Sequence, residues 1–300
     1  MCNSVEIQDY LKRQQEKIDQ RLEQALPPGH PLAKVLYESM HYSLLGGGKR
    51  IRPILTLAAA EAVGCQSALV MPYAAALELI HTYSLVHDDL PAMDNDDYRR
   101  GRLTNHKVYG DGLAILAGDA LLTMAFELCS QPSAETGIPA DRQVRVIHEL
   151  AVGAGHDGMV GGQVMDIQAE NQDIDLMTLQ TIHRYKTGKL IRAAVRIGGI
   201  LGGATHTQLE NLSAYAEDIG LAFQIADDVL NMTGTREELG KDAGTDAKRG
   251  KKTYPSFFGV DGARDLATDC INRAVKRLDA FGAPADPLRA IAHYVIQRRN

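Results

Sequence analysis

Apolar residues recur at spacings of three and four along most of this chain, whereas alternating, strand-like runs are scarce. This spacing is typical of helices that bury one face. Hydrophobic residues make up 45% of the chain but aromatic residues only 5%, and there is no Trp, which favours a core of Ala, Leu, Ile and Val. The pattern therefore predicts an all-α fold.

Gly, Pro and short polar turns divide the chain into candidate helices. We expect these helices at 4–25, 31–46, 51–63, 70–90, 105–130, 139–154, 161–170, 175–202 and 206–232, with two or three more after 254. The turn-rich stretches are too short to be domain linkers, so we predict one domain over residues 1–300. Residues 234–253 are polar and glycine-rich, and they are predicted to form a mobile lid.

Charge and composition exclude several classes of protein. The net charge is -6, with 32 Lys and Arg against 38 Asp and Glu, so a nucleic-acid surface is not expected. The four cysteines have no paired spacing, which argues against a zinc site or a disulfide framework. The first residues lack the apolar run of a signal peptide, and no run of about 18 apolar residues predicts a membrane-spanning helix. We expect a soluble cytoplasmic protein.

A first acidic cluster follows an apolar helix in the stretch HDDLPAMDNDDYRRG, which contains Asp88, Asp89 and Asp94. Crowded carboxylates repel one another and lose hydration, so they need a compensating cation. Magnesium, which prefers carboxylate, water and phosphate oxygens, fits this requirement. On a continuous helix Asp94 would lie about 240° around from Asp88. The backbone must therefore bulge or break near Pro91 if both residues are to reach one metal.

A second polar cluster lies in QIADDVLN, where Gln224, Asp227, Asp228 and Asn231 recur at three and four residue intervals. Such residues line one face of a helix. Taken alone, that face is also consistent with the exposed side of a surface helix.

Two further segments carry polar residues that suit a bound phosphate. HRYKTGKLIRAA supplies Lys186 as a point charge and the Thr187 hydroxyl, and GGQVMDI supplies Gln163 and Asp166 one turn apart. With the Gln224 amide, Thr187 offers a neutral oxygen beside a developing cation. Singly, each of these residues is equally compatible with a helix cap or a surface position.

A basic loop, LLGGGKRIRP, joins two candidate helices near the amino end. Its glycines allow backbone N–H groups to converge at a helix start, next to Lys49, Arg50 and Arg52. The loop lacks the spacing of a nucleotide P-loop. We interpret it as an anion site, the alternative being a turn with solvated charges.

Together these segments resemble the short-chain trans-isoprenyl diphosphate synthases, most closely those of bacterial farnesyl type. The resemblance is carried, in order, by GGGKRIRP, YSLVHDDLPAMDNDDYRRG, AILAGDALLTMAF, GGQVMDI, HRYKTGKLIRAAVR, LAFQIADDVLN, LGKDAGTDAKRGKKTYP and YVIQR. It implies a single-domain, isoprenoid-synthase-type helical bundle around a deep central cavity, usually assembled as a homodimer. It also implies an enzyme that uses magnesium to join an allylic diphosphate to isopentenyl diphosphate.

The resemblance assigns roles to individual residues. Three magnesium ions are expected on Asp88, Asp94 and Asp227, supported by Asp89, Asp228 and Asn231. The allylic diphosphate is expected to contact Arg99, Lys186 and Lys241. Isopentenyl diphosphate is expected at Gly48, Lys49, Arg52, His81 and Arg100. The allylic cation would face the Lys186 carbonyl, Thr187 and Gln224, and the basic stretch ending in Lys251 and Lys252 would close over the phosphates.

One position departs from the family pattern. The second motif reads DDVLN, where the family commonly has a third Asp, so Asn231 keeps an oxygen but lacks the charge. The resulting hypothesis is a third magnesium that binds more weakly.

Product length is expected to depend on Tyr83 and Ser84, which precede Asp88 by one turn or slightly more. The resemblance places the chain-length gate there, and a bulky Tyr83 suggests a farnesyl product, with geranylgeranyl diphosphate as the alternative. Two rival functions are a class I terpene cyclase, which would not need GGGKRIRP, and a non-catalytic subunit of a heteromeric synthase.

Overall fold

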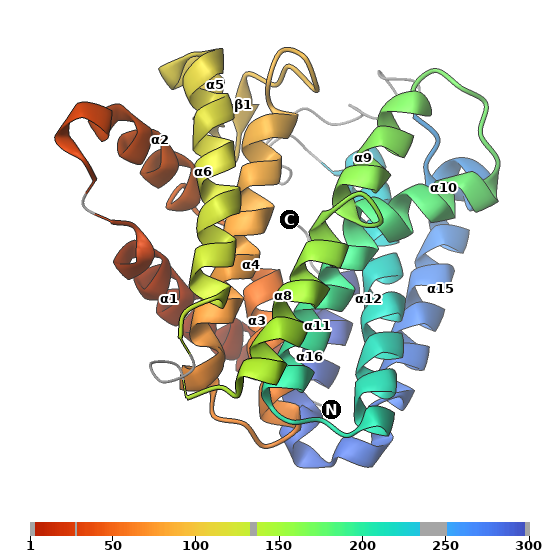
Figure 1. Cartoon of the computed structure of the whole chain (residues 1–300). Coiled ribbons are helices and arrows are strands. Elements are labelled where there is room, and N and C mark those ends of the chain that lie inside the picture. The colour runs from red at the N-terminus through yellow and green to blue at the C-terminus, as the bar shows by residue number, and fades with distance from the viewer. Residues whose placement is uncertain (1–3, 28, 133–136, 235–250, 298–300) are drawn as a thin grey trace.

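The computed structural model describes residues 4–27, 29–132, 137–234 and 251–297, with element labels as in Figure 1. The first half contains α1 (Ser4–Ala25), η1 (Pro31–Ala33), α2 (Lys34–Leu44), α3 (Ile51–Ala62), α4 (Ser67–Asp88), β1 (Tyr98–Arg99), β2 (Arg102–Leu103), α5 (Asn105–Tyr109) and α6 (Asp111–Cys129). The second half contains α8 (Ala140–Ala154), α9 (Met159–Gln168), α10 (Leu176–His183), η2 (Arg184–Gly188), α11 (Lys189–Leu201), α12 (His206–Thr233), α15 (Tyr254–Lys276), η3 (Asp279–Phe281), η4 (Ala283–Ala285) and α16 (Asp286–Gln297).

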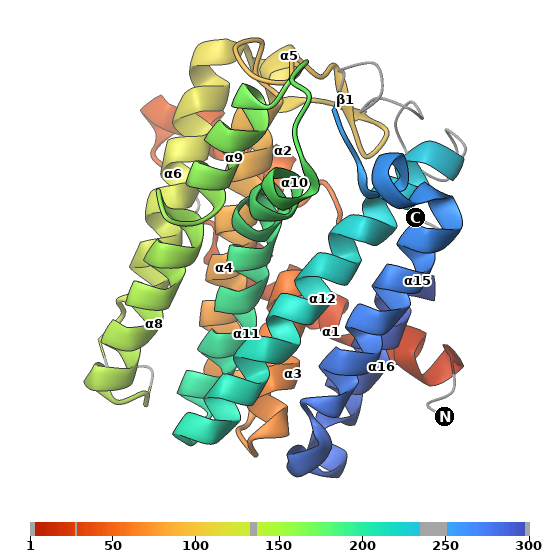
Figure 2. The same ribbon diagram turned by 90° about the vertical axis from the view of Figure 1, so that its right-hand side faces the viewer.

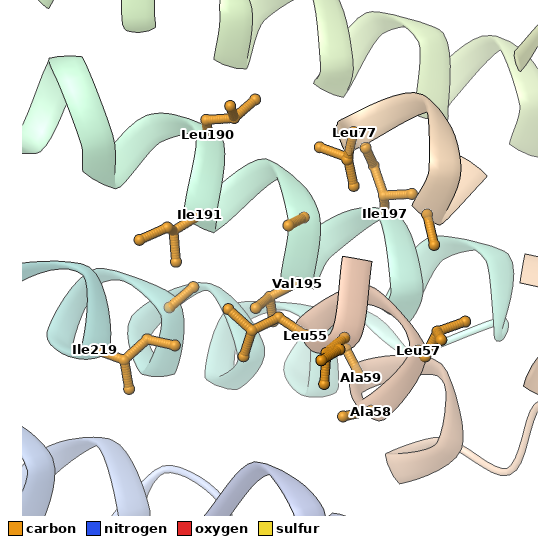
Figure 3. Close-up of a cluster of buried hydrophobic side chains, with 14 of the residues drawn as sticks. Leu55, Leu57, Ala58, Ala59, Leu77, Leu190, Ile191, Val195, Ile197 and Ile219 are labelled. Carbon is orange, nitrogen blue, oxygen red and sulfur yellow. The ribbon is translucent and has the colours of Figure 1, made fainter. Parts of the chain in front are cut away.

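The long helices run side by side as a bundle (Figures 1 and 2). Helix α12 packs along α15, α4 along α6, and α11 along both α3 and α8. Branched and small side chains from these helices interlock at the centre, among them Leu55, Leu77, Val195 and Ile219 (Figure 3). The predicted all-α fold and its aliphatic core are confirmed.

A close contact between α11 and α3 in this core depends on a missing side chain. A Cβ atom on Gly198 of α11 would collide with the Thr56 carbonyl of α3. Gly198 therefore lets the two backbones approach, which brings the start of α3 and the segment before α11 to the same end of the bundle.

Two of the predicted helices are interrupted. The expected helix at 105–130 is divided by Gly110, whose φ of 85° is a left-handed value that glycine adopts without strain, so α5 and α6 are separate. The expected helix at 175–202 contains the π-helical turn η2 between α10 and α11. Neither feature changes the apolar spacing that predicted a single helix in each case.

A two-stranded antiparallel hairpin, which the sequence analysis did not predict, joins α4 to α5. Its turn has positive φ at Arg100 and Gly101, 53° and 75°, as two-residue hairpin turns require. Each strand has only two residues, too few to show an alternating pattern. The hairpin holds Arg99 and Arg100 beside the end of α4.

Two described helices, α4 and α6, are long and apolar enough to cross a membrane by length and composition alone, a test that the core helix of a globular protein also meets. In α4, 67% of the apolar window is buried within the bundle, as in the core helix of a globular protein. In α6 the buried share is only 44%, and Ile115 and Leu116 are exposed. The cytoplasmic location stays a prediction.

Candidate active site

The first wall of the site consists of Asp88, Asp89 and Asp94. Helix α4 ends at Asp88, and a turn then brings the Asp94 N–H to the Asp88 carbonyl, 2.9 Å away. The Leu90 carbonyl accepts from both Met93 and Asn95 within the same turn. The predicted break near Pro91 is therefore present, and it places Asp94 against the end of the helix that carries Asp88.

The electrostatics of Asp88 favour a bound cation. Burial raises the pKa of Asp88 to about 6, and the charges of Asp94 and Asp89 act in the same direction, whereas Lys186 and Arg99 oppose it. A carboxylate in such surroundings is stabilised by a metal ion held between it and its acidic neighbours. The donor set therefore fits magnesium.

Asp89 orients the arginine that follows it. The Arg99 guanidinium donates to both Asp89 oxygens in a forked arrangement, with distances of 2.6, 2.8 and 2.9 Å. Burial still raises the pKa of Asp89, because it outweighs the effect of Arg99. Since the forked pair fixes a planar group, Asp89 holds Arg99 at the rim of the site.

The second wall, consisting of Gln224, Asp227, Asp228 and Asn231, belongs to α12. All four residues line a cavity of about 400 Å³, together with a group of basic residues. The basic residues at this cavity are Lys49, Lys186, Lys251 and Lys252. The alternative reading of this face as an exposed helix surface is wrong, because Asp228 and Asn231 are buried.

Asp228 also has a structural contact. Its Oδ2 accepts a hydrogen bond from the Tyr254 N–H, 2.9 Å away, at the first residue of α15. Helix starts leave such N–H groups without helical partners, and a carboxylate stabilises them. Asp228 therefore joins the second wall to the helix that follows the 235–250 segment.

Lys186 and Lys251 form a pair held by one carboxylate. Their Nζ atoms lie 2.6 and 2.7 Å from the same oxygen, Oδ2 of Asp166 on α9. Lys251 also lies 3.5 Å from Glu170, one turn further along. The sequence analysis noted Asp166 but did not assign it to the site, and it missed Glu170.

The π-helical turn η2 sets the position of Lys186 and Thr187. The Lys189 N–H bonds to the Arg184 carbonyl, five residues earlier, so the turn is wider than in an α-helix. Such turns often occur at functional sites. Thr187 is buried, and a side chain on Gly162 of α9 would collide with the Lys186 backbone, so α9 and η2 are in close contact.

His183 is a further cavity residue that the sequence analysis missed. Its ring lies against the Tyr254 ring, with 5.5 Å between centroids. Burial lowers the pKa of His183 to about 4, with Lys186 and Lys251 acting in the same direction and Asp166 opposing. The imidazole is therefore neutral at pH 7 and adds no charge beside the lysine pair.

Arg50 fixes the basic loop to the bundle. Its guanidinium donates to Glu78 at 2.7 Å, to Asp19 at 2.8 Å and to the Leu44 carbonyl at 2.8 Å. Arg50 has a left-handed φ of 52° and is the residue before α3. From the sequence, Arg50 was expected to be one of the charges of the anion loop together with Lys49 and Arg52, and its pairing with Glu78 and Asp19 was not predicted.

A basic cluster near this loop consists of Arg52, His81 and Arg100, whose charges act on one another. Burial and the charges of Arg52 and Arg100 lower the pKa of His81 well below its usual value. Burial also lowers the pKa of Arg52, and Arg52 Nε has no hydrogen-bond partner among the described residues. Arg100 donates to the Gly47 carbonyl and packs against Gly48. Like charges gathered in this way favour a bound anion.

The predicted chain-length residues lie on α4 as expected from the spacing. Tyr83 is buried and meets His87 edge-on, with 5.8 Å between ring centroids. Burial, followed by the charge of Asp88, raises the pKa of Tyr83 to about 12. The Ser84 hydroxyl donates to the His81 carbonyl at 2.8 Å.

The described residues contain no group of three or more His, Cys, Asp or Glu side chains arranged to hold a metal without other ligands. Magnesium is commonly coordinated by one or two carboxylates, with water and substrate phosphate as its other ligands. Lys241 and most of the predicted lid lie outside the described residues.

Comparison with known proteins identifies the family. The family profile described as Polyprenyl synthetase matches residues 33–281. Over 293 residues the chain is 51% identical to a dimethylallyltranstransferase of Fischerella ambigua (strain UTEX 1903), covering 97% of this chain and 84% of that protein. It is 47% identical over 292 residues to a geranylgeranyl diphosphate synthase of Cyanophora paradoxa, covering 97% and 96%.

Solved structures agree with the sequence matches. The crystal structure of an FPP/GFPP synthase from Zymomonas mobilis superposes with a TM-score of 0.87 at 37% identity, over 98% of this chain and 100% of that one. The names of these relatives cover several product lengths, so they identify the class of enzyme and not its product. The chain is a prenyltransferase that belongs to the polyprenyl synthetase family.

Proposed function

We propose that this enzyme elongates dimethylallyl or geranyl diphosphate with isopentenyl diphosphate to give (2E,6E)-farnesyl diphosphate, with geranylgeranyl diphosphate as the alternative product. The observation that supports the proposal is the presence of two groups of basic residues that could each bind an anion. One lines the cavity of the second wall and includes Lys186 and Lys251, and the other is the basic cluster of Arg52, His81 and Arg100. Two diphosphate substrates require two such groups, whereas a terpene cyclase requires one.

The chemistry begins with binding of the allylic diphosphate. Lys186 and Lys251 would bind its oxygens, and Asp88, Asp94 and Asp227 would hold magnesium beside them. Magnesium, when bound, would neutralise the negative charge that develops on the leaving diphosphate. The role of Asn231 as a weaker ligand of the third ion stays a prediction.

Neutral oxygens would stabilise the allylic cation, namely the Lys186 carbonyl, the Thr187 hydroxyl and the Gln224 amide. The basic cluster would hold isopentenyl diphosphate with its alkene facing that cation. Cleavage of the allylic C–O bond would release diphosphate and leave the cation, and attack of the alkene would form the new carbon–carbon bond. The proton then lost from the isopentenyl unit would pass to the released diphosphate. The neutral His183 keeps further positive charge away from the cation.

The function is tested by incubating the purified chain with isopentenyl diphosphate, either allylic diphosphate and magnesium, then separating products by length. Elongated products that require both substrates are expected. Turnover of the allylic substrate alone would indicate a cyclase, and no turnover would indicate a non-catalytic subunit.

Tyr83→Ala should lengthen the main product by at least one prenyl unit, because removal of the buried ring deepens the space below Asp88. Product chromatography measures this change. Tyr83→Phe is the matched control, since it retains the ring, and it should give the wild-type product. An unchanged profile for Tyr83→Ala would remove Tyr83 from the chain-length gate.

We also propose a homodimer. Helix α6 is the more apolar of the two long helices described above but is less than half buried, and α8 and α9 lie on the same side of the bundle (Figures 1 and 2). Exposed apolar residues on these helices are Ile115, Leu116, Val144, Val152, Val160 and Val164. A second copy covering this face would bury them. Light scattering during gel filtration would give twice the chain mass if this is correct.

A further inference from the structure

Asp166 binds two ammonium groups with one carboxylate oxygen. Lys186 approaches Oδ2 from η2 at 2.6 Å, and Lys251 approaches the same atom at 2.7 Å from the segment before α15. The three side chains come from three different elements, and all three are at least partly buried. Two positive charges that would otherwise repel one another are thus kept together by one anion.

The surrounding structure fixes this geometry. Gly162 allows α9 to contact the Lys186 backbone, and Asp166 follows one turn later on the same face of α9. Burial alone would raise the pKa of Asp166, but Lys186 and Lys251 outweigh it and the pKa is lowered. The pKa of Lys251 is raised, because Asp166 outweighs the opposite effect of burial. Asp166 and Lys251 are therefore charged at neutral pH.

The same two lysines also face the first wall. Lys186 is the largest attractive influence on Asp88, and Lys251 interacts with Asp94. The lysine pair therefore contacts Asp166 directly and also interacts electrostatically with the first wall. A diphosphate that binds with magnesium at the first wall would contact both ammonium groups, which Asp166 already holds close together.

We propose that Asp166 is a positioning residue for the allylic diphosphate, which holds Lys186 and Lys251 together so that both can bind diphosphate oxygens at once. The inference rests on the proposed function, because it identifies this cavity as the allylic diphosphate site. Asp166 acts through the lysines and contacts no reacting atom. Positioning two donors in advance reduces the ordering that the substrate must otherwise impose.

The test measures the dissociation constant of inorganic diphosphate, with magnesium, by calorimetry. Asp166→Asn keeps the shape of the side chain but removes the charge, and it should weaken binding about tenfold, equivalent to about 1.4 kcal/mol. The KM for geranyl diphosphate should rise similarly, while kcat changes by less than about threefold. Asp166→Glu, which restores the charge, should recover part of the affinity. If Asp166→Asn does not fold, Asp166→Glu provides the test, because its longer side chain shifts the carboxylate and should still weaken binding relative to the wild type.

A double-mutant cycle separates positioning from a general structural role. If Asp166 acts through Lys251, Asp166→Asn must weaken binding less in a Lys251→Ala background than in the wild type, by about threefold or more. Asp173→Asn is the matched control, because Asp173 pairs with Lys252 at 2.9 Å but is 91% exposed. It should change the dissociation constant by less than about twofold.

Three results would overturn the role of Asp166. Two are unchanged and tighter diphosphate binding in Asp166→Asn. The third is a double variant whose dissociation constant rises by the product of the two single-variant factors, which would show that the residues act independently. Tighter binding would mean that Asp166 only competes with diphosphate. If diphosphate binding depends on Asp166 but the wild type forms no elongated product, the positioning role stands and the proposed function fails.

Discussion

Asp88→Asn is expected to lower the rate of product formation by about a thousandfold or more, equivalent to about 4 kcal/mol of transition-state stabilisation. The amide retains the volume and one oxygen of Asp88 but lacks the charge that would hold magnesium at the leaving diphosphate. Because loss of a metal ligand acts on the transition state, kcat should fall more than the affinity for substrate. Steady-state rates with geranyl and isopentenyl diphosphates measure the loss.

The same substitution should stabilise the metal-free protein by about 1–2 kcal/mol at pH 7, because it removes a charge that burial disfavours. Burial raises the pKa of Asp88 to about 6 from its usual value of 3.8. Between these two values the folded state binds more protons at Asp88 than the unfolded state does. The contribution of Asp88 to stability therefore increases as the pH falls from about 6 towards 4.

Thermal unfolding at pH 7 and pH 5, with a chelator present, tests both the stabilisation by Asp88→Asn and its dependence on pH. The stability advantage of Asp88→Asn over the wild type should be largest at pH 7 and should shrink at pH 5. Asp265→Asn, at an exposed position on α15, is the control and should alter neither rate nor stability. A variant that is active, or one that is less stable than the wild type at pH 7, would contradict this description of the first wall.

Glu78→Ala should lower the free energy of unfolding by about 3–5 kcal/mol. The side chains of Arg50 and Glu78 are 1% and 2% exposed, and their ion-pair distance is 2.7 Å. Removing Glu78 leaves the Arg50 guanidinium buried with only the partly exposed Asp19 as an acidic partner. Glu78→Gln should cost less, because the amide oxygen still accepts a hydrogen bond.

Urea denaturation measures this loss, and Glu38→Ala provides a control. Glu38 pairs with Lys34 at 3.2 Å, but both side chains are mostly exposed, so its removal should cost less than about 0.5 kcal/mol. Because Arg50 precedes α3, Glu78→Ala should also raise the KM for isopentenyl diphosphate at the basic cluster. Equal stability of the two alanine variants would show that Arg50 does not fix the loop.

The sequence was sufficient to predict the helical fold because apolar spacing is preserved across each long helix. It also predicted the break near Pro91, since proline does not fit inside a helix and a continuous helix would place Asp94 away from Asp88. The interruption at Gly110 and the π-helical turn η2 were missed, because both leave the apolar spacing almost unchanged. The hairpin beside Arg99 is too short to have a periodic pattern.

Within the site, residues were predictable where several polar groups stand close together in the sequence. The pairings of Asp166 and Arg50 were not predicted because their partners are distant in sequence: Lys251 lies 85 residues from Asp166, and Glu78 lies 28 from Arg50. A signal for Asp166 was available in Gly162, which indicates close backbone contact one turn earlier. The partner of that contact was visible only in the fold.

The two walls are expected to form one diphosphate site only when magnesium and a diphosphate are both bound. The most direct test is the affinity of the wild-type protein for inorganic diphosphate, measured by calorimetry with a chelator and then with magnesium, after subtraction of titrations into buffer. We predict that magnesium strengthens binding by at least about a hundredfold, and that Asp88→Asn removes most of this gain. Equal affinity with and without magnesium would show that the two walls do not form a magnesium-dependent diphosphate site.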